Sequence, residues 1–170
     1  MGSLGAALGT MVANLSSHKR GWDDRCPEFS EWAEKGMSAQ SELNRLVDED
    51  TDAFNKIMDA FKLPKQTDEE KAIRKQAIQD ATKNAIMVPF KIMETAHKSL
   101  EMIKAMAETG NPNSVSDAGV GALAVRSAVK GAYLNVKINS QDLNDKDFVN
   151  DILKKAEKKL EELKDEFQEN

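Results

Sequence analysis

Apolar residues recur along this chain at the three- and four-residue spacing of amphipathic helices, and they predict five helical segments. The first is a small-residue, apolar helix over residues 2–18. In it Gly5, Gly9 and Ala13 repeat at every fourth position. This spacing places all three on one smooth face, so we expect the glycines to serve close packing against another helix.

The second predicted helix is long, covers residues 28–62 and contains Gly36 as a candidate interruption. Its expected core stripe is Leu43, Val47, Phe54, Ile57 and Phe61. Asp50 falls in the gap of this stripe, and a carboxylate on a core-facing stripe is costly unless it has a partner. Asp50 is therefore either an edge residue bonded to a neighbouring helix or a functional acid with a perturbed pKa.

The third predicted helix begins at a T-x-x-E capping box formed by Thr67 and Glu70. Its apolar pattern continues to about Gly110, where Gly-Asn-Pro predicts a loop. Pro89 lies inside the pattern and lacks a backbone N–H group. We therefore expect this proline to kink or split the helix.

The last two predicted helices cover residues 114–139 and the stretch from about Asp145 to the C-terminal region. Ser114 and Asp117 have the S-x-x-D spacing of a capping-box variant, so both have a possible structural role. The sequence has no internal repeat and no low-complexity linker. These features predict an all-α, multihelical bundle of about five long helices in a single domain, residues 1–170.

The helix over residues 114–139 has an unusual composition, because each of its three glycines costs about 1 kcal/mol relative to alanine in a helix interior. On a helical wheel, small residues lie between polar ends on one face, while Arg126, Lys130 and Lys137 lie roughly opposite. The small-residue face consists of Asp117, Gly121, Ala124, Ala128, Gly131, Asn135 and Asn139. Such a strip accepts either a flat ligand or a neighbouring backbone, and the second is the commoner outcome.

Composition supports the all-helical prediction and narrows the function. Charged residues make up 31% of the chain and aromatic residues 5%, and the net charge of −5 comes from interleaved acids and bases, which argues against nucleic-acid binding. Cys26 is the only cysteine, which fits a reducing compartment. The apolar start is too short to span a bilayer and lacks the basic region of a signal peptide. We therefore expect a cytoplasmic protein without membrane association.

The sequence lacks the common catalytic and nucleotide-binding motifs, including G-x-S-x-G, H-E-x-x-H, CxxC and the Walker loop. With two histidines and one cysteine, a zinc site is not expected. His97 lies beside an apolar stripe, where a core histidine is commoner than an acid–base group. Two possibilities remain: a reaction that needs neither a metal nor a cofactor, or no reaction at all.

Four runs of the sequence resemble the formimidoyltetrahydrofolate cyclodeaminase family, which includes the cyclodeaminase half of formimidoyltransferase-cyclodeaminase and stand-alone methenyltetrahydrofolate cyclohydrolases. The runs are GAALGTMVANLSSHKRGWDD, LVDEDTDAFNKIMDAFKLPK, NPNSVSDAGVGA and GAYLNVKIN. The resemblance covers nearly the whole chain. It implies an all-helical, intertwined homodimer whose substrate is a polyglutamylated folate, with no further cofactor.

The implied reaction converts 5-formimidoyltetrahydrofolate to 5,10-methenyltetrahydrofolate and ammonia, a step of histidine degradation and one-carbon metabolism. For this reaction, Asp117 and Asp50 are the candidates for acid–base work and for stabilising the cationic product, with the two roles not assigned between them. Candidates for binding the pterin or the amidine are Asn113, Ser114, Ser116 and Asn135. Candidates for the glutamate carboxylates are His18, Lys19, Arg20 and Lys65.

The resemblance has one departure, at the N-terminus. Family members usually carry a preceding helix and a Pro-Gly-Gly-Gly-Ser stretch, whereas this sequence starts inside the first Gly/Ala helix. We therefore expect an N-terminally shortened domain. Two alternatives stay open: the related cyclohydrolase activity, and a non-catalytic helical dimerisation module. A formimidoyltransferase domain or chain is an expected partner.

Overall fold

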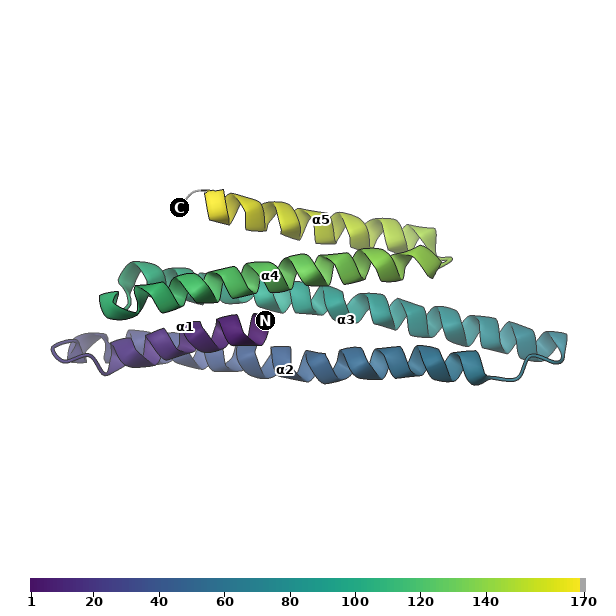
Figure 1. Cartoon of the computed structure of the whole chain (residues 1–170), viewed down its shortest axis with the longest axis horizontal. Coiled ribbons are helices and arrows are strands. Elements are labelled where there is room, and N and C mark those ends of the chain that lie inside the picture. Colours follow the sequence, from purple (N-terminus) through teal and green to yellow (C-terminus); the bar gives the residue numbers. More distant parts are fainter. Residues whose placement is uncertain (169–170) are drawn as a thin grey trace. The chain divides into compact units, whose positions relative to one another are not determined.

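The computed structural model describes residues 1–168 and is helical throughout, with no strand in that range (Figure 1). Its elements in chain order are α1 (Gly2–Ser17), η1 (Asp23–Arg25), α2 (Cys26–Lys62), α3 (Asp68–Thr109), η2 (Pro112–Ser114), α4 (Val115–Asn139), η3 (Ser140–Asp142) and α5 (Lys146–Gln168), where η denotes a short 3-10 helix. The all-α prediction is confirmed. None of these helices is both long and apolar enough to cross a membrane.

The helices contribute to two compact units. The first unit contains residues 1–44 and 92–130, and the second contains residues 45–91 and the described part of 131–170. Helices α2, α3 and α4 each supply residues to both units, whereas α1 belongs to the first and α5 to the second. The prediction of a single domain stays a prediction.

Close helix contacts through glycines organise the first unit. A side chain at Gly5 would place its Cβ 2.7 Å from the Gly121 carbonyl oxygen of α4. A Cβ at Gly9 would lie 2.6 Å from the Met102 sulfur of α3, and one at Gly36 would collide with the Thr10 hydroxyl of α1. The packing role predicted for the glycines of α1 is therefore confirmed. Gly36 does not interrupt α2, because it gives α1 room to approach.

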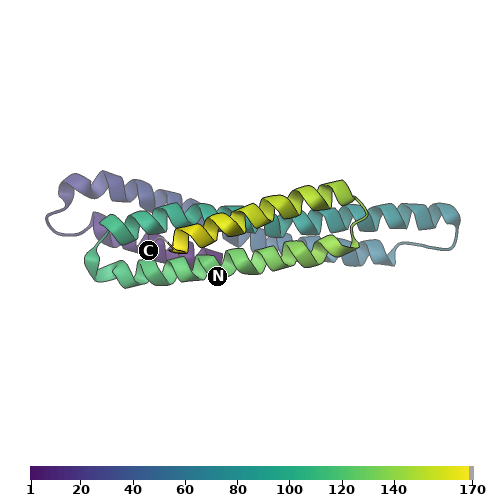
Figure 2. The same cartoon turned by 90° about the horizontal axis from the view of Figure 1, so that it is seen from above.

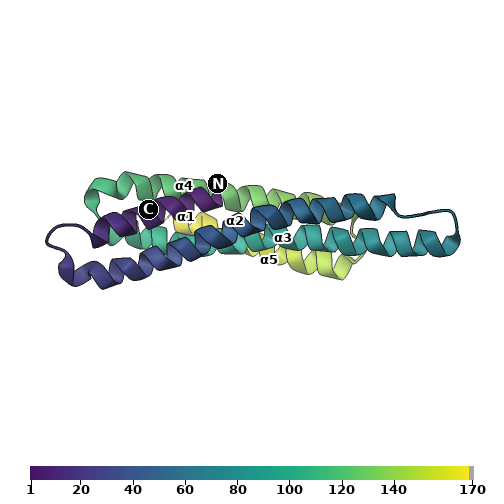
Figure 3. The same ribbon diagram turned by 90° about the horizontal axis from the view of Figure 1, so that it is seen from below.

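In the second unit, the later part of α2 and the earlier part of α3 run antiparallel on either side of a short loop (Figure 3). The predicted capping box forms at the start of α3, where the Thr67 hydroxyl accepts from the Glu70 backbone N–H at 3.1 Å and the Glu70 carboxylate accepts from the Thr67 N–H at 3.1 Å. Helix α5 runs beside the later part of α4 (Figure 2), where the Tyr133 hydroxyl donates to Glu157 at 3.5 Å.

Pro89 does not split α3, which continues without a break from Asp68 to Thr109. The proline has no N–H to donate to the carbonyl four residues earlier, that of Ala85. This carbonyl instead accepts a hydrogen bond of 2.8 Å from the side-chain amide of Asn139 on α4. The unbroken helix is therefore possible because a neighbouring helix supplies the missing donor.

We expect Asn139→Asp to reduce the free energy of unfolding by about 1–3 kcal/mol, because a carboxylate cannot donate to the carbonyl of Ala85 and leaves it unsatisfied. Urea denaturation measures the change, and Asn135→Asp on the exposed side of α4 is the matched control. Combining Asn139→Asp with Pro89→Ala, which restores a backbone donor, should reduce the cost. An equal cost in both backgrounds would contradict this explanation.

The stripe predicted as the core face of α2 is correct at Leu43, which is buried, and wrong in the later part of the helix. Val47, Phe54 and Phe61 have 60%, 61% and 50% of their surface exposed. The buried residues on this part of the helix are Leu46, Ala53 and Ala60. A helix with two apolar faces needs more than one neighbour to cover both, and the described chain covers one. Asp50 lies at the border of the two faces and is exposed.

The small-residue face predicted on α4 is not one continuous open strip. In the first unit Gly121 and Ala124 are buried, with Gly121 against α1, whereas in the second unit Gly131 and Asn135 are exposed. No described atom lies within 4 Å of a Cβ built on Gly119 or Gly131. Packing therefore explains Gly121, while the other two glycines of α4 face open space in the described chain.

Asp145 caps the start of α5. Its carboxylate accepts from the Phe148 backbone N–H at 3.1 Å and pairs with the Lys83 ammonium at 3.0 Å. The Phe148 hydrogen bond, followed by the Lys83 contact, lowers the pKa of the Asp145 carboxyl below its usual value. A carboxyl whose pKa is lowered by folding stabilises the fold above its unfolded-state pKa and loses this effect as pH falls.

We therefore expect Asp145→Ala to lower the melting temperature near neutral pH, and the difference from the wild type to shrink as pH falls below about 4. Thermal unfolding followed by circular dichroism over a pH series measures it. Asp147→Ala, which removes an exposed acid from the same helix turn, is the control. A difference that persists unchanged in strong acid would contradict the capping role.

Candidate functional site

The end of α1 and the start of α4 meet at one end of the first unit. The Ser16 hydroxyl accepts from the Asn111 backbone N–H at 2.8 Å, which ties α1 to the turn before α4. Nearby, the Arg25 guanidinium donates to the carbonyl of Thr109 at 3.2 Å and joins the start of α2 to the end of α3. Two predicted groups, residues 18–20 and 113–117, therefore lie at the same end of this unit.

Asp117 is half-buried in the first turn of α4. The capping box expected with Ser114 does not form: within the described residues, neither the Asp117 carboxylate nor the Ser114 hydroxyl takes part in a hydrogen bond or an ion pair. A carboxylate is electrostatically favoured at a helix N-terminus. Asp117 is thus a sheltered carboxylate that remains available to a ligand.

The basic residues after α1 have contacts of their own. The Lys19 ammonium lies 3.8 Å from the centre of the Trp22 ring, and Trp22 stacks on Phe29 with ring centres 5.5 Å apart. His18 and Arg20 are exposed. Lys19 already has an aromatic partner. The side chains of His18 and Arg20 are therefore more accessible to a ligand than that of Lys19. Their role as carboxylate ligands stays a prediction.

The predicted polar ligands differ in accessibility. Asn113 and Ser116 are exposed, whereas Ser114 is buried. The Asn113 backbone N–H donates to the Asn111 side chain at 3.2 Å, which fixes the turn ahead of α4. Asn113 and Ser116 thus present side chains next to Asp117 in the chain, whereas Ser114 exposes only 5% of its surface.

Three predicted site residues belong to the second unit. Asp50 lies on α2, Lys65 in the loop between α2 and α3, and Asn135 on α4, and all three are exposed. The structure brings together the predicted residues of the first unit, whereas Asp50 is exposed on α2 of the second unit. Asp117 is therefore the better supported of the two catalytic candidates.

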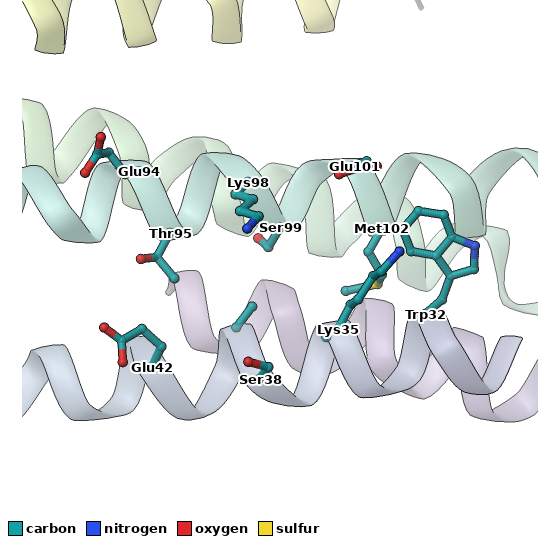
Figure 4. Close-up of a pocket in the computed structure, with 12 residues that line it drawn as sticks. Trp32, Lys35, Ser38, Glu42, Glu94, Thr95, Lys98, Ser99, Glu101 and Met102 are labelled. Atoms are coloured by element: carbon teal, nitrogen blue, oxygen red, sulfur yellow. The ribbon is translucent and has the colours of Figure 1, made fainter. Parts of the chain in front are cut away.

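A cavity of about 470 Å³ lies between α2 and α3 of the first unit, and we call it the Trp32 cavity (Figure 4). It is lined by Trp32, Lys35, Gly36, Ser38, Ala39, Glu42, Glu94, Thr95, Lys98, Ser99, Glu101 and Met102. The sequence did not predict this cavity, because its two walls are about 60 residues apart in the chain. The sequence feature that could have indicated the cavity is the polar residues at helical spacing on the facing parts of α2 and α3.

The described residues contain no group of three or more histidine, cysteine, aspartate or glutamate side chains arranged to hold a metal ion. The acids that line the Trp32 cavity are separated along it, with Glu42 and Glu94 at one end and Glu101 at the other (Figure 4). The region around Asp117 and the Trp32 cavity therefore offer carboxylates, ammonium groups, hydroxyls and an indole ring to a ligand.

A family model described as formiminotransferase-cyclodeaminase matches residues 1–158. The chain belongs to this family. The resemblance noted in the sequence runs is thereby confirmed, and the cyclodeaminase-type helical fold with it.

Relatives within the family carry different activities in their names. The chain is 37% identical over 161 residues to a methenyltetrahydrofolate cyclohydrolase of Methylorubrum extorquens, covering 95% of this chain and 77% of that protein. It is 38% identical over 162 residues to the formimidoyltransferase-cyclodeaminase of Gallus gallus, covering 95% of this chain but only 30% of that longer protein. Both relatives, the cyclohydrolase and the formimidoyltransferase-cyclodeaminase, are folate-processing enzymes by name.

The crystal structure of a formiminotetrahydrofolate cyclodeaminase from Thermotoga maritima has the same fold. It superposes with a TM-score of 0.78 at 28% sequence identity, covering 95% of this chain and 78% of that chain. The helical arrangement of the cyclodeaminase family is thus shared along nearly the whole chain.

Proposed function

We propose that this chain catalyses the cyclisation of 5-formimidoyltetrahydrofolate to 5,10-methenyltetrahydrofolate with release of ammonia. Family membership supports a reduced folate as the substrate. The observation that carries the proposal is the half-buried, unpartnered carboxylate of Asp117 in the first turn of α4. It offers a proton acceptor in a sheltered position beside exposed hydrogen-bonding groups.

The reaction needs positioning and proton transfer. N10 of the folate attacks the amidinium carbon and forms a tetrahedral intermediate, and N10 loses its proton. The amino group on that carbon gains a proton and leaves as ammonia, while the carbon becomes the methenyl cation. One carboxylate can accept the first proton and deliver it to the leaving nitrogen, and its charge stabilises the cation that forms. We assign this work to Asp117, with Asn113 and Ser116 as ligands for the pterin or the amidine.

Methenyltetrahydrofolate cyclohydrolase activity is the second candidate, favoured by the 37% identity to a cyclohydrolase over most of both chains. In that reaction water opens the methenyl ring, and the same carboxylate would activate the water. Incubating the purified protein separately with 5-formimidoyltetrahydrofolate and with 5,10-methenyltetrahydrofolate tests both. The proposed activity predicts ammonia and rising methenyl absorbance with the first substrate, and loss of absorbance with the second alone would favour the hydrolase.

We also infer that the protein works as a homodimer. The outer face of α4 exposes Leu123, Leu134 and Ile138 to 56%, 62% and 61%, and the later α2 exposes a second apolar stripe, Val47, Phe54, Met58 and Phe61. Large apolar side chains exposed along helix faces are candidates for a protein interface. A formimidoyltransferase domain or chain remains the expected functional partner. Sedimentation analysis tests the dimer, and a monomer at micromolar concentration would contradict it.

Absence of turnover with both folates would support the remaining alternative, a non-catalytic helical dimerisation module. In that case the Asp117 carboxylate would have only an electrostatic role at the start of α4.

A further inference from the structure

The Trp32 cavity has distinct ends. Trp32 and Met102 lie at the end nearer the start of α2, and the carboxylates of Glu42 and Glu94 lie at the other end (Figure 4). The volume of about 470 Å³ is in the range of small-molecule sites. The lining thus offers a flat aromatic surface and one carboxylate, Glu101, at one end and two carboxylates at the other.

The two lysines of the cavity differ in their contacts. The Lys35 ammonium lies 4.3 Å from the centre of the Trp32 ring and pairs with Glu31 at 2.9 Å. Lys98, by contrast, has no ion-pair partner anywhere in the described chain. Lys98 lies between the two ends of the cavity (Figure 4). It is therefore the lining cation that is available to a bound anion, and the Ser38 and Thr95 side chains add hydroxyl donors.

We propose that the Trp32 cavity holds the aminobenzoyl-glutamate portion of the folate, with the benzoyl ring against Trp32 and a glutamate carboxylate on Lys98. This inference rests on the proposed function for the identity of the ligand. Stacking on an indole and a charge-assisted bond to an unpaired ammonium are the interactions that an aryl carboxylate of this kind can make. The order of Trp32 and Lys98 along the cavity sets the orientation: the ring lies at the end nearer the start of α2, and the carboxylate lies further along the cavity.

This orientation is compatible with the candidate chemistry. Trp32 lies about six residues, or about 9 Å of helix, from the first residue of α2. The start of α2 adjoins the end of α3, as the Arg25–Thr109 hydrogen bond shows, and α4 begins a few residues further on. A ring at Trp32 therefore points the pterin toward the end of the first unit that carries Asp117.

The proposal changes the assignment of the glutamate tail. The family resemblance suggested residues 18–20 and Lys65 as ligands for the glutamate tail. The cavity instead gives its first carboxylate to Lys98, a residue that the sequence alone does not distinguish from other helical lysines. Residues 18–20 lie at the pterin end in this arrangement.

The fluorescence of Trp32 tests the binding step. The chain has two tryptophans, so Trp22→Phe leaves Trp32 as the only indole. We expect saturable quenching of this variant by p-aminobenzoyl-glutamate. Adding Lys98→Met should weaken the binding roughly 10- to 100-fold, as expected for loss of one charge-assisted hydrogen bond, and Lys98→Arg should restore most of it. Lys104→Met, an exposed lysine on the same helix outside the cavity, is the matched control.

Turnover provides the second readout. In the otherwise unaltered protein, Lys98→Met should raise KM for the folate by the same factor and leave kcat nearly unchanged, since Lys98 binds the tail rather than the reacting atoms. Normal turnover with an unchanged KM in Lys98→Met and no quenching by the fragment would overturn this proposal and leave the proposed function standing. Fragment binding that depends on Lys98 in a protein without folate turnover would support the cavity assignment and refute the proposed reaction.

Discussion

We expect Asp117→Asn to lower kcat for folate cyclisation about 100- to 10,000-fold, the range for loss of a general acid–base group. Asparagine has the size of aspartate but cannot accept the N10 proton or return it to the departing nitrogen. KM should change little, because the substitution removes proton transfer rather than substrate contacts. Methenyl-folate absorbance measures the rate.

A structural role for Asp117 predicts a different result. Loss of a carboxylate from a helix N-terminus costs about 0.3–1 kcal/mol of stability and leaves turnover of the folded protein intact. Asp24→Asn, which removes an exposed acid at the same end of the first unit, is the control and should retain wild-type kcat. Near wild-type turnover in Asp117→Asn would show that Asp117 is not the catalytic group.

Gly5→Ala should cause a large loss of stability, at least about 1–3 kcal/mol, because the added methyl group meets backbone that cannot move away. The new Cβ would lie 2.7 Å from the Gly121 carbonyl oxygen and 3.2 Å from the Val125 backbone nitrogen of α4. Accommodating it requires α1 and α4 to separate. Urea denaturation followed by circular dichroism measures the effect.

Gly119→Ala is the matched control, since it is the same substitution in a helix of the same unit. No described atom lies within 4 Å of the new methyl group there. Alanine should stabilise that position by about 0.5–1 kcal/mol relative to glycine. Equal effects of the two substitutions would mean that the contact between α1 and α4 is not as close as described.

Local sequence signals predicted the helices well. The capping box of Thr67 and Glu70, the Gly-Asn-Pro break and the start of the last helix near Asp145 each depend on residues within a few positions, so the sequence could predict them. The expectation that Pro89 could split the helix is wrong for the converse reason. The donor that compensates for it comes from Asn139, 54 positions from the carbonyl it satisfies.

The same limit applies to packing faces. Periodicity shows that α2 has apolar residues at helical spacing, but Leu46 and Val47 differ by one position and only one of them is buried. The choice depends on which side the neighbouring helices approach. A stripe that other copies cover is indistinguishable, in sequence, from one that the chain itself covers.

The candidate site was predicted in part. Family motifs and helix position pointed to Asp117, and the structure adds that its carboxylate is half-buried and unpartnered. The Trp32 cavity could not be predicted, because it forms only when α2 and α3 lie side by side. Lys98 is of interest because it lines this cavity and forms no ion pair within the described residues, and the fold decides both.

Calorimetric titration of the purified protein with tetrahydrofolate tests the central claim, that this chain binds a reduced folate, without assuming which reaction follows. The account predicts saturable binding that Lys98→Met weakens and Lys104→Met does not. A titration with no heat of binding at any accessible concentration, together with no turnover of either folate substrate, would contradict it.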